Sequence, residues 1–194
     1  VLHVRNLGST ESTVVPGTER VVYAFWSPDS RSLAFYSLGK IRRVDLAGGG
    51  PREIGGTGNV GSGSWNQQGK ILFRALSGSV IRQVPASGGP ATTVVESGEK
   101  ERFAQGPNFL ADGRRYLVLT TRPDGESVLE LRAIDSTERS TLVERNPTLG
   151  SVATTPEGSY LVYARDATLV AQPFDESRAR VVGEPIPIVD NIGR

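Results

Sequence analysis

One short stretch recurs along the chain and limits what the chain can fold into. Its first copy, residues 26–35, reads as a strand end, a tight turn and a second strand, and related stretches follow at 65–73, 109–118 and 154–162. The first residues of these copies are separated by 39, 44 and 45 residues. A period of about 40–45 residues built from short strands is typical of a β-propeller, in which four-stranded sheets called blades surround a central axis. The repeat therefore predicts an all-β propeller of four-stranded antiparallel blades.

The repeat also predicts the domain organisation: one half blade followed by about four complete blades in a single segment, 1–194. The first twenty residues show the same alternation of apolar and polar residues, and the same turn, as the outer half of the next unit. They therefore match the outer two strands of a blade whose inner two strands are missing. The expected boundaries are 1–20 for the half blade and 21–57, 58–97, 98–147 and 148–194 for the complete blades.

Apolar alternation bounded by Gly, Pro, Asn and Asp predicts the individual strands. In the first two complete units the expected strands are 21–26, 32–36, 40–45, 52–54, 63–65, 70–74, 80–84 and 91–95. In the last two units they are 115–120, 128–133, 150–154, 160–165, 168–173 and 185–189. Residues 96–103 contain helix-compatible residues but are short and bounded by glycine, so a loop with at most one helical turn is expected there.

Composition excludes several function classes. Twenty-two Lys and Arg against 21 Asp and Glu give a net charge of +1, so the chain carries no field that would attract nucleic acid. The absence of cysteine removes disulfides, thiolate catalysis and cysteine metal sites. No apolar run approaches the ~20 residues of a membrane helix, and no signal peptide is recognisable. A chain that opens Val1-Leu2-His3 and contains no methionine is expected to be a processed or excised piece of a longer one.

Motifs that would indicate catalysis or cofactor binding lack the neighbouring elements that such sites need. Residues 56–61 satisfy the pattern G-x-G-x-x-G, but a strand ending at Trp65 is expected next instead of the helix that a dinucleotide needs. The single histidine, His3, lies in an expected outer strand, and no G-x-S-x-G element is present. We therefore expect a non-catalytic chain that holds no cofactor and no metal.

The aspartates and the repeating aromatic residues have structural interpretations. Asp29 and Asp112 fall in turns, and other aspartates end the third strands, where a carboxylate accepts nearby backbone N–H groups. Trp26, Trp65 and Phe109 repeat at matching positions, which predicts that each packs between adjacent blades.

The sequence around the first repeat resembles a known family. Residues 25–35, followed by Ile41, Val44-Asp45 and a Gly-Gly turn, resemble the WD-repeat-like blades of TolB-type β-propellers. The stretches 64–66, 84–89, 109–114 and 169–175 are similar to the propeller that follows the kinase domain in many bacterial serine/threonine protein kinases. Ser30 departs from that pattern, since it stands where glycine is usual, and Thr154 stands where an aromatic residue is usual.

The resemblance carries expectations about the whole protein. Propellers of this kind close with six or more blades, so four and a half units predict an open arc, or part of a larger ring completed by blades of the parent chain. The end blades of such an arc expose unpaired edges and apolar faces. The resemblance further implies an interaction or sensing module attached to a bacterial kinase, on the periplasmic or extracytoplasmic side of the envelope and without direct membrane insertion.

In propellers, partners usually meet the loops that enter the innermost strands, here 16–22, 55–62, 96–106 and 144–150. This places a protein, a peptide or a small polar ligand on that loop face, with no nucleic acid among the partners. The candidate binding residues are Arg20, Asn59, Lys100, Arg102, Arg145 and Asn146. Two alternatives remain open: a propeller cap on an α/β-hydrolase peptidase, and a TolB-like periplasmic scaffold.

Overall fold

The computed structural model describes residues 1–55, 60–75, 80–95 and 103–192, and every regular element in these ranges is a β-strand. The chain opens with a hairpin of β1 (Leu2–Val4) and β2 (Thr13–Val15). No helix in the described ranges is long and apolar enough to cross a membrane.

Four larger antiparallel sheets follow in chain order. The first contains β3 (Val21–Trp26), β4 (Ser32–Ser37), β5 (Lys40–Asp45) and β6 (Arg52–Gly55). The second contains β7 (Val60–Trp65), β8 (Lys70–Ala75), β9 (Val80–Pro85) and β10 (Thr92–Val95). The third contains β11 (Phe103–Phe109), β12 (Arg115–Thr121), β13 (Ser127–Ala133) and β14 (Arg139–Val143).

The last sheet has an additional strand. β15 (Ser151–Thr155), β16 (Gly158–Arg165) and β17 (Thr168–Asp175) pair in order, and two short strands share the outer edge of β17. These are β18 (Arg180–Val181), which pairs near the end of β17, and β19 (Ile186–Val189), which pairs near its start. The sequence predicts β19 but not β18.

Two of the expected connecting loops are shorter than predicted. The expected loop 55–62 overlaps β7, which begins at Val60, so a strand and not a helix follows the glycine-rich pattern. The expected loop 96–106 overlaps β11, which begins at Phe103. Gly106 and Pro107 lie inside β11 at a register shift between Gln105 and Asn108, which explains why propensity alone suggested a loop there. The helical turn considered for 96–103 lies almost entirely outside the described residues.

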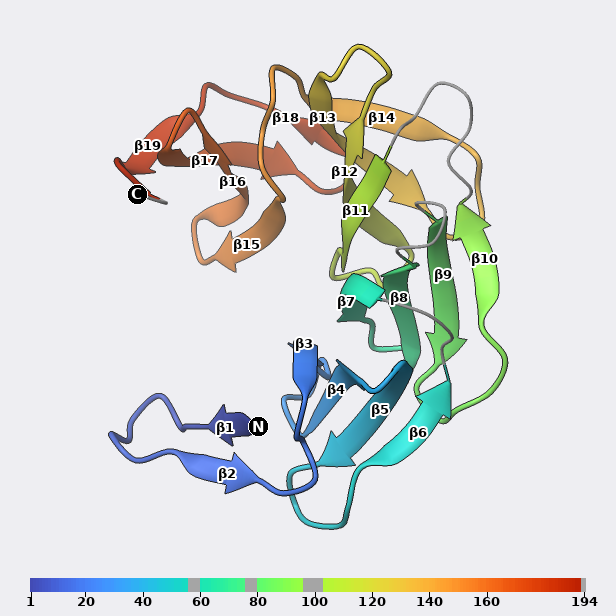
Figure 1. The fold of residues 1–194 in the computed structure, drawn as a ribbon. Coiled ribbons are helices and arrows are strands. Elements are labelled where there is room, and N and C mark those ends of the chain that lie inside the picture. The colour runs from blue at the N-terminus through green and yellow to red at the C-terminus, as the bar shows by residue number, and fades with distance from the viewer. Residues whose placement is uncertain (56–59, 76–79, 96–102, 193–194) are drawn as a thin grey trace.

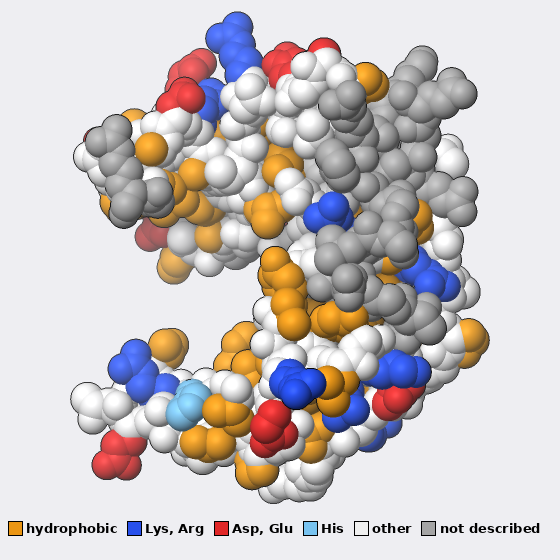
Figure 2. Space-filling model, in the orientation of Figure 1, with side chains coloured by type: hydrophobic (Ala, Val, Ile, Leu, Met, Phe, Trp, Pro, Cys, Tyr) orange, Lys and Arg blue, Asp and Glu red, His pale blue; other side chains and the backbone are white. Residues whose placement is uncertain are grey.

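The sheets follow one another along an open arc, with the β1–β2 hairpin and β15–β19 at its two ends (Figure 1). The first strands of the first three of these sheets, β3, β7 and β11, lie next to one another on the inner side of the arc. In the space-filling view the two ends are separated by a wide gap, and hydrophobic side chains are visible on the concave side (Figure 2).

Each apolar core lies between two consecutive sheets, because successive side chains of a strand point to opposite faces. On β4, Leu33 and Phe35 pack against the β1–β2 hairpin, whereas Ala34 and Tyr36 pack against the second sheet. On β8 and β12, the second strands of the next two sheets, alternate side chains likewise pack into the cores on opposite sides of the sheet. Gly63 on β7 permits close contact with β3, because a Cβ there would come within 2.9 Å of the ring of Phe25.

The packing prediction for the repeating aromatic residues is confirmed for two of them and wrong for the third. Trp65 packs against the core between the first two complete sheets, and Phe109 packs against the next core, with its ring edge-on to Tyr116. Trp26 pairs with Leu33 and therefore faces the β1–β2 hairpin, and it stays 47% exposed. The physical reason is that this hairpin occupies only the outer half of a blade.

The turn after each of these aromatic residues contains one residue with left-handed backbone. Gly69 and Gly113 have φ values of 72° and 67°, and Ser30 has a φ of 57° at the equivalent position of the first complete sheet. A side chain in this conformation costs about 1 kcal/mol. The departure from glycine noticed in the sequence is therefore a site of backbone strain.

Exchanging the two residue types should produce opposite changes in stability. Ser30→Gly should raise the free energy of unfolding, by less than about 1 kcal/mol, since glycine also gains freedom in the unfolded chain. Gly69→Ser should lower it by about 1 kcal/mol, although nothing lies within 4 Å of an added Cβ. Urea unfolding of the two variants beside the parent protein measures both effects, and a destabilised Ser30→Gly protein would contradict this explanation.

The last sheet exposes an apolar face at the end of the arc. Val162, Ala171 and Ile186 are directly paired on β16, β17 and β19 and so point to the same side, opposite to Leu161 and Val170 in the core. Ile186 is 51% exposed. This face matches the one that other sheets bury against a neighbour.

We expect this face to drive concentration-dependent self-association of the isolated chain. Ile186→Lys should shift the apparent mass toward that of a monomer, because it places a charge on this exposed apolar face. Leu38→Lys is the matched control, since Leu38 is 59% exposed in the turn between β4 and β5. Size-exclusion chromatography with light scattering at several concentrations measures the effect, and a compact monomer at all concentrations would contradict it.

Candidate functional site

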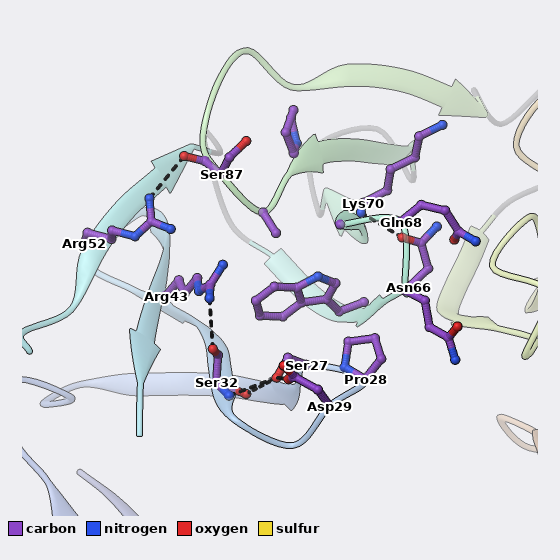
Figure 3. Close-up of a pocket in the computed structure, with 15 residues that line it drawn as sticks. Ser27, Pro28, Asp29, Ser32, Arg43, Arg52, Asn66, Gln68, Lys70 and Ser87 are labelled. Carbon is purple, nitrogen blue, oxygen red and sulfur yellow. Dashed lines mark hydrogen bonds between the residues drawn. The ribbon is translucent and has the colours of Figure 1, made fainter. Parts of the chain in front are cut away.

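A cavity of about 800 Å³ lies between the first two complete sheets, on the face that carries the turns after β3, β5, β7 and β9. This is the opposite face from the loops that enter the innermost strands. Its walls come from the turns after β3 and β7, from two outer strands and from the turn after β9 (Figure 3). The lining residues are Ser27, Pro28, Asp29, Ser32, Arg43, Arg52, Trp65, Asn66, Gln67, Gln68, Gly69, Lys70, Pro85, Ala86 and Ser87.

Trp65 ends β7 and lines this cavity with its side chain half-buried. The guanidinium carbon of Arg43 lies 5.0 Å from the centroid of the Trp65 ring, a cation–π contact. Arg43 comes from β5 of the neighbouring sheet, so the contact joins two consecutive sheets.

Arg43 is held in place by a small polar network. Its Nη2 lies 2.7 Å from an oxygen of Asp45, and the same nitrogen donates to the Ser32 hydroxyl at 3.1 Å. The Ser32 hydroxyl donates to Asp45 at 2.6 Å. The hydrogen bond from Ser32, followed by that from Arg43, lowers the pKa of Asp45 below its ordinary value. Asp45 is therefore ionised at neutral pH and fixes the guanidinium against the indole ring.

The turn after β3 forms another wall and satisfies its own polar groups. The Ser27 hydroxyl donates to Asp29 at 2.6 Å and accepts the backbone N–H of Ser32 at 2.9 Å. Asp29 also accepts the backbone N–H of Arg31. The pKa of Asp29 is lowered, mainly by the hydrogen bond from Ser27. The interpretation of this aspartate as turn chemistry is confirmed.

Asn66 joins the second sheet to the third and was not singled out by the sequence. Its side chain is buried, its oxygen accepts the backbone N–H of Lys70 at 2.7 Å, and its amide donates to the carbonyl of Gly113 at 2.6 Å. Gln68 makes a longer contact of 3.4 Å to the carbonyl of Asp112 in the same turn. Although Asn66 lines the cavity, its hydrogen-bonding groups are occupied within the protein.

A second, smaller cavity of about 180 Å³ adjoins the first on the other side of Trp65. Its further wall is apolar and comes from Phe109, Leu110 and Ala111 of the third sheet. Both cavities are lined by Pro28, Trp65, Asn66 and Gln67. We call the two together the hairpin-turn groove.

The larger end of the hairpin-turn groove is cationic. Arg43, Arg52 and Lys70 line it, and Asp29 is the carboxylate among the lining residues. Arg52 donates through Nη1 to the carbonyl of Ser87 at 3.1 Å, and within the described part of the chain it has no ion-pair partner. Lys70 contributes to lowering the pKa of Asp135, so its charge also acts toward the third sheet.

The candidate residues on the loop face are not gathered into one site. Asn59, Lys100 and Arg102 lie outside the described residues. Arg20 precedes β3 and Arg145 precedes β15, which lie at different ends of the arc (Figure 1), and both side chains are exposed. All three described candidates have left-handed backbone, with φ values of 58°, 65° and 56° for Arg20, Arg145 and Asn146.

Asn146 has a structural role. Its backbone N–H donates to the carbonyl of Ser127 at 3.0 Å, and its side-chain oxygen accepts the backbone N–H of Ser127 at 2.7 Å. It therefore fixes the connection into β15 against the start of β13. His3, in contrast, is an exposed residue of β1, as the sequence predicts.

Comparison with solved structures decides the fold. The chain superposes on TolB from Acinetobacter baumannii with a TM-score of 0.69 over 97% of its length, at 17% identity. The fold is that of a β-propeller. The predicted all-β class with four-stranded antiparallel blades is thereby confirmed.

Other similar structures are described as different kinds of protein. A putative gluconolactonase superposes with a TM-score of 0.62 over 86% of this chain, at 12% identity, and a calcium-binding regucalcin from Agrobacterium tumefaciens with 0.63 over 89%, at 14% identity. The chain spans 63%, 48% and 60% of the gluconolactonase, TolB and regucalcin chains. No protein-family profile and no curated protein sequence matches it. At these identities the likeness shows the fold alone.

Asn66→Ala should destabilise the protein by about 2 kcal/mol, because it leaves the partly buried N–H of Lys70 and the buried carbonyl of Gly113 without their partner. Gln68→Ala is the matched control from the same turn and should change the free energy of unfolding by less than about 0.5 kcal/mol. Chemical denaturation measures both. Equal effects of the two substitutions would show that Asn66 does not hold the second and third sheets together.

Proposed function

We propose that this chain is a non-catalytic binding module and that its ligand enters the hairpin-turn groove. The observation that carries the proposal is the position of Trp65, half-buried between two cavities with the Arg43 guanidinium against its ring. Concave sites with an aromatic residue and a few convergent polar groups are the usual places for ligands. Trp and Arg are also the residue types that dominate binding energy at protein interfaces.

The state of the nearby carboxylates supports a binding role over a catalytic one. The pKa values of Asp29 and Asp45 are lowered by hydrogen bonds within their own turns. A general acid or base works best with a pKa near the operating pH, and the pKa values of these two carboxylates are shifted away from neutral pH. They serve to order the turn and to orient Arg43.

The proposal places the ligand on the other face from the one that the sequence suggested. The loop-face candidates Arg20 and Arg145 are exposed in separate connections, whereas the groove residues from three consecutive sheets converge. The partner remains a protein or peptide segment, or a small polar ligand. Because the ligand contacts groups from several blades, its affinity should depend on how those blades pack.

The setting of the module comes from the sequence resemblance. We propose that the chain belongs to the propeller of a bacterial serine/threonine kinase, that further blades of the parent chain continue the arc, and that it works outside the cytoplasm. A propeller that caps a peptidase and a TolB-like scaffold are the alternatives. The parent gene distinguishes them, through a kinase domain, an α/β-hydrolase domain, or a signal peptide without either.

A peptide selection with a built-in reporter tests the binding site. Trp26→Phe leaves Trp65 as the sole tryptophan, so that emission reports on the groove. Random peptides selected on phage against this protein should shift the Trp65 emission on binding, since they displace water from the ring. Arg52→Ala should weaken the selected peptides by about tenfold or more.

Arg145→Ala is the matched control, because it removes an equally exposed arginine from the loop face. Peptides that bind without changing Trp65 emission, or that lose affinity with Arg145→Ala and not with Arg52→Ala, would contradict the proposed site. Such a result would instead favour the loop face as the binding site.

A further inference from the structure

The two ends of the hairpin-turn groove differ in chemistry. The larger end carries the guanidinium groups of Arg43 and Arg52, and the smaller end is walled by Phe109, Leu110 and Ala111. The apolar residues Pro28 and Trp65 line both ends, together with the polar residues Asn66 and Gln67. A ligand that fills the groove therefore needs an anionic group at one end and an apolar group at the other.

We infer that the ligand is an extended acidic peptide segment, which places a carboxylate at Arg43 and Arg52 and an apolar side chain beside Phe109. This inference rests on the proposed function, since it specifies the ligand of the same groove. It does not depend on the resemblance to any family.

Arg52 is the group that most needs an anion. Its Nη1 donates to a neutral carbonyl oxygen, and no carboxylate among the described residues lies within ion-pair distance. A planar guanidinium with unused N–H groups matches the geometry of a carboxylate. An acidic side chain at this position would complete the coordination of Arg52.

Arg43 is already arranged for binding. Its Nε donates to Asp45, its Nη2 donates to Ser32 and forms an ion pair with Asp45, and the Trp65 ring lies against the guanidinium carbon. Within the described residues its Nη1 makes no hydrogen bond, so one edge of the fork remains for a ligand. Because the side chain is held by the protein, little conformational entropy is lost when a carboxylate binds.

The shape of the groove favours a peptide over a small anion. A single carboxylate or phosphate would occupy only the cationic end and leave the apolar wall at Phe109 uncovered. The cationic end lies between the first and second sheets, the apolar wall belongs to the third, and Trp65 of the second sheet lines both cavities. An extended chain advances by 3.3–3.6 Å per residue and can span such a surface while its side chains reach both ends.

Fluorescein-labelled peptides of defined sequence test the inference. The probes carry Glu-Glu, a spacer of one to four glycines, and Phe-Leu, and each has a counterpart with Gln-Gln in place of Glu-Glu. In fluorescence polarisation, the best acidic peptide should bind at least about tenfold more tightly than its Gln counterpart. The difference should shrink as salt is added, because the attraction is electrostatic.

Two matched arginine variants locate the carboxylate. Arg52→Gln should remove the preference for the acidic peptide and leave the affinity of the Gln peptide unchanged. Arg145→Gln, on the opposite face, should leave the preference intact. Replacing Phe in the probe by Ser should weaken binding to the parent protein, which tests the apolar end without changing the protein.

The inference is overturned if the acidic and Gln peptides bind equally, if Arg52→Gln retains the preference, or if no spacer gives binding. The proposed function fails separately. Neutral peptides that shift Trp65 emission and lose affinity with Arg52→Ala would uphold the groove as the binding site while refuting its preference for acidic ligands. Loss of all selected binding with Arg145→Ala alone would refute the groove itself.

Discussion

The structure depends on the face-to-face packing of consecutive sheets through their second strands. Each such strand supplies side chains to two cores, as when Leu33 and Phe35 face backward along the chain and Ala34 and Tyr36 face forward. No sheet can therefore bury both of its faces without a neighbour on each side. This constraint accounts for the partly exposed Trp26 at one end of the arc and the exposed Ile186 at the other. It also places the groove at a junction between sheets, where the turns of two units meet beside their shared core.

The sequence alone predicts those features of the structure that depend only on residues within one repeat. The turn between β3 and β4 is determined by Ser27, Asp29 and the left-handed residue at 30, and all of these are local in the chain. Strand β11 was missed, because Gly106 and Pro107 argue against a strand and only pairing with β12 overrides them. The groove could not be predicted, since it brings together Arg43 and Trp65 from different repeats. The aromatic repeat predicts that Trp65 is a packing residue. It does not predict which face of the Trp65 ring stays uncovered.

The groove joins a structural role to the proposed binding role in the same residues. Arg43 stabilises the junction between two sheets through Trp65, and the network with Ser32 and Asp45 holds it there. Each of these contacts is modest alone, because partly exposed ion pairs contribute little to stability. Together they fix the orientation of a cation at a cavity wall, which is what a site for an anionic ligand requires. Arg52 has no ion pair of this kind within the described residues, although its charge also contributes to lowering the pKa of Asp45.

One difference between equivalent residues accompanies the difference in cavity size between one junction and the next. Ser27 and Asn66 occupy the same place after their aromatic residue, and the side-chain oxygen of each accepts the N–H that closes its own turn. The hydroxyl of Ser27 is then used within that turn, on Asp29, and is too short to reach the following sheet. Asn66 has an amide group left over, and it donates to Gly113 in the next sheet. That hydrogen bond joins the second and third turns, where the cavity beside Phe109 has about 180 Å³, whereas the cavity between the first two sheets has about 800 Å³. In the described part of the chain, the junction with the smaller cavity is thus the one at which an asparagine side chain links consecutive turns.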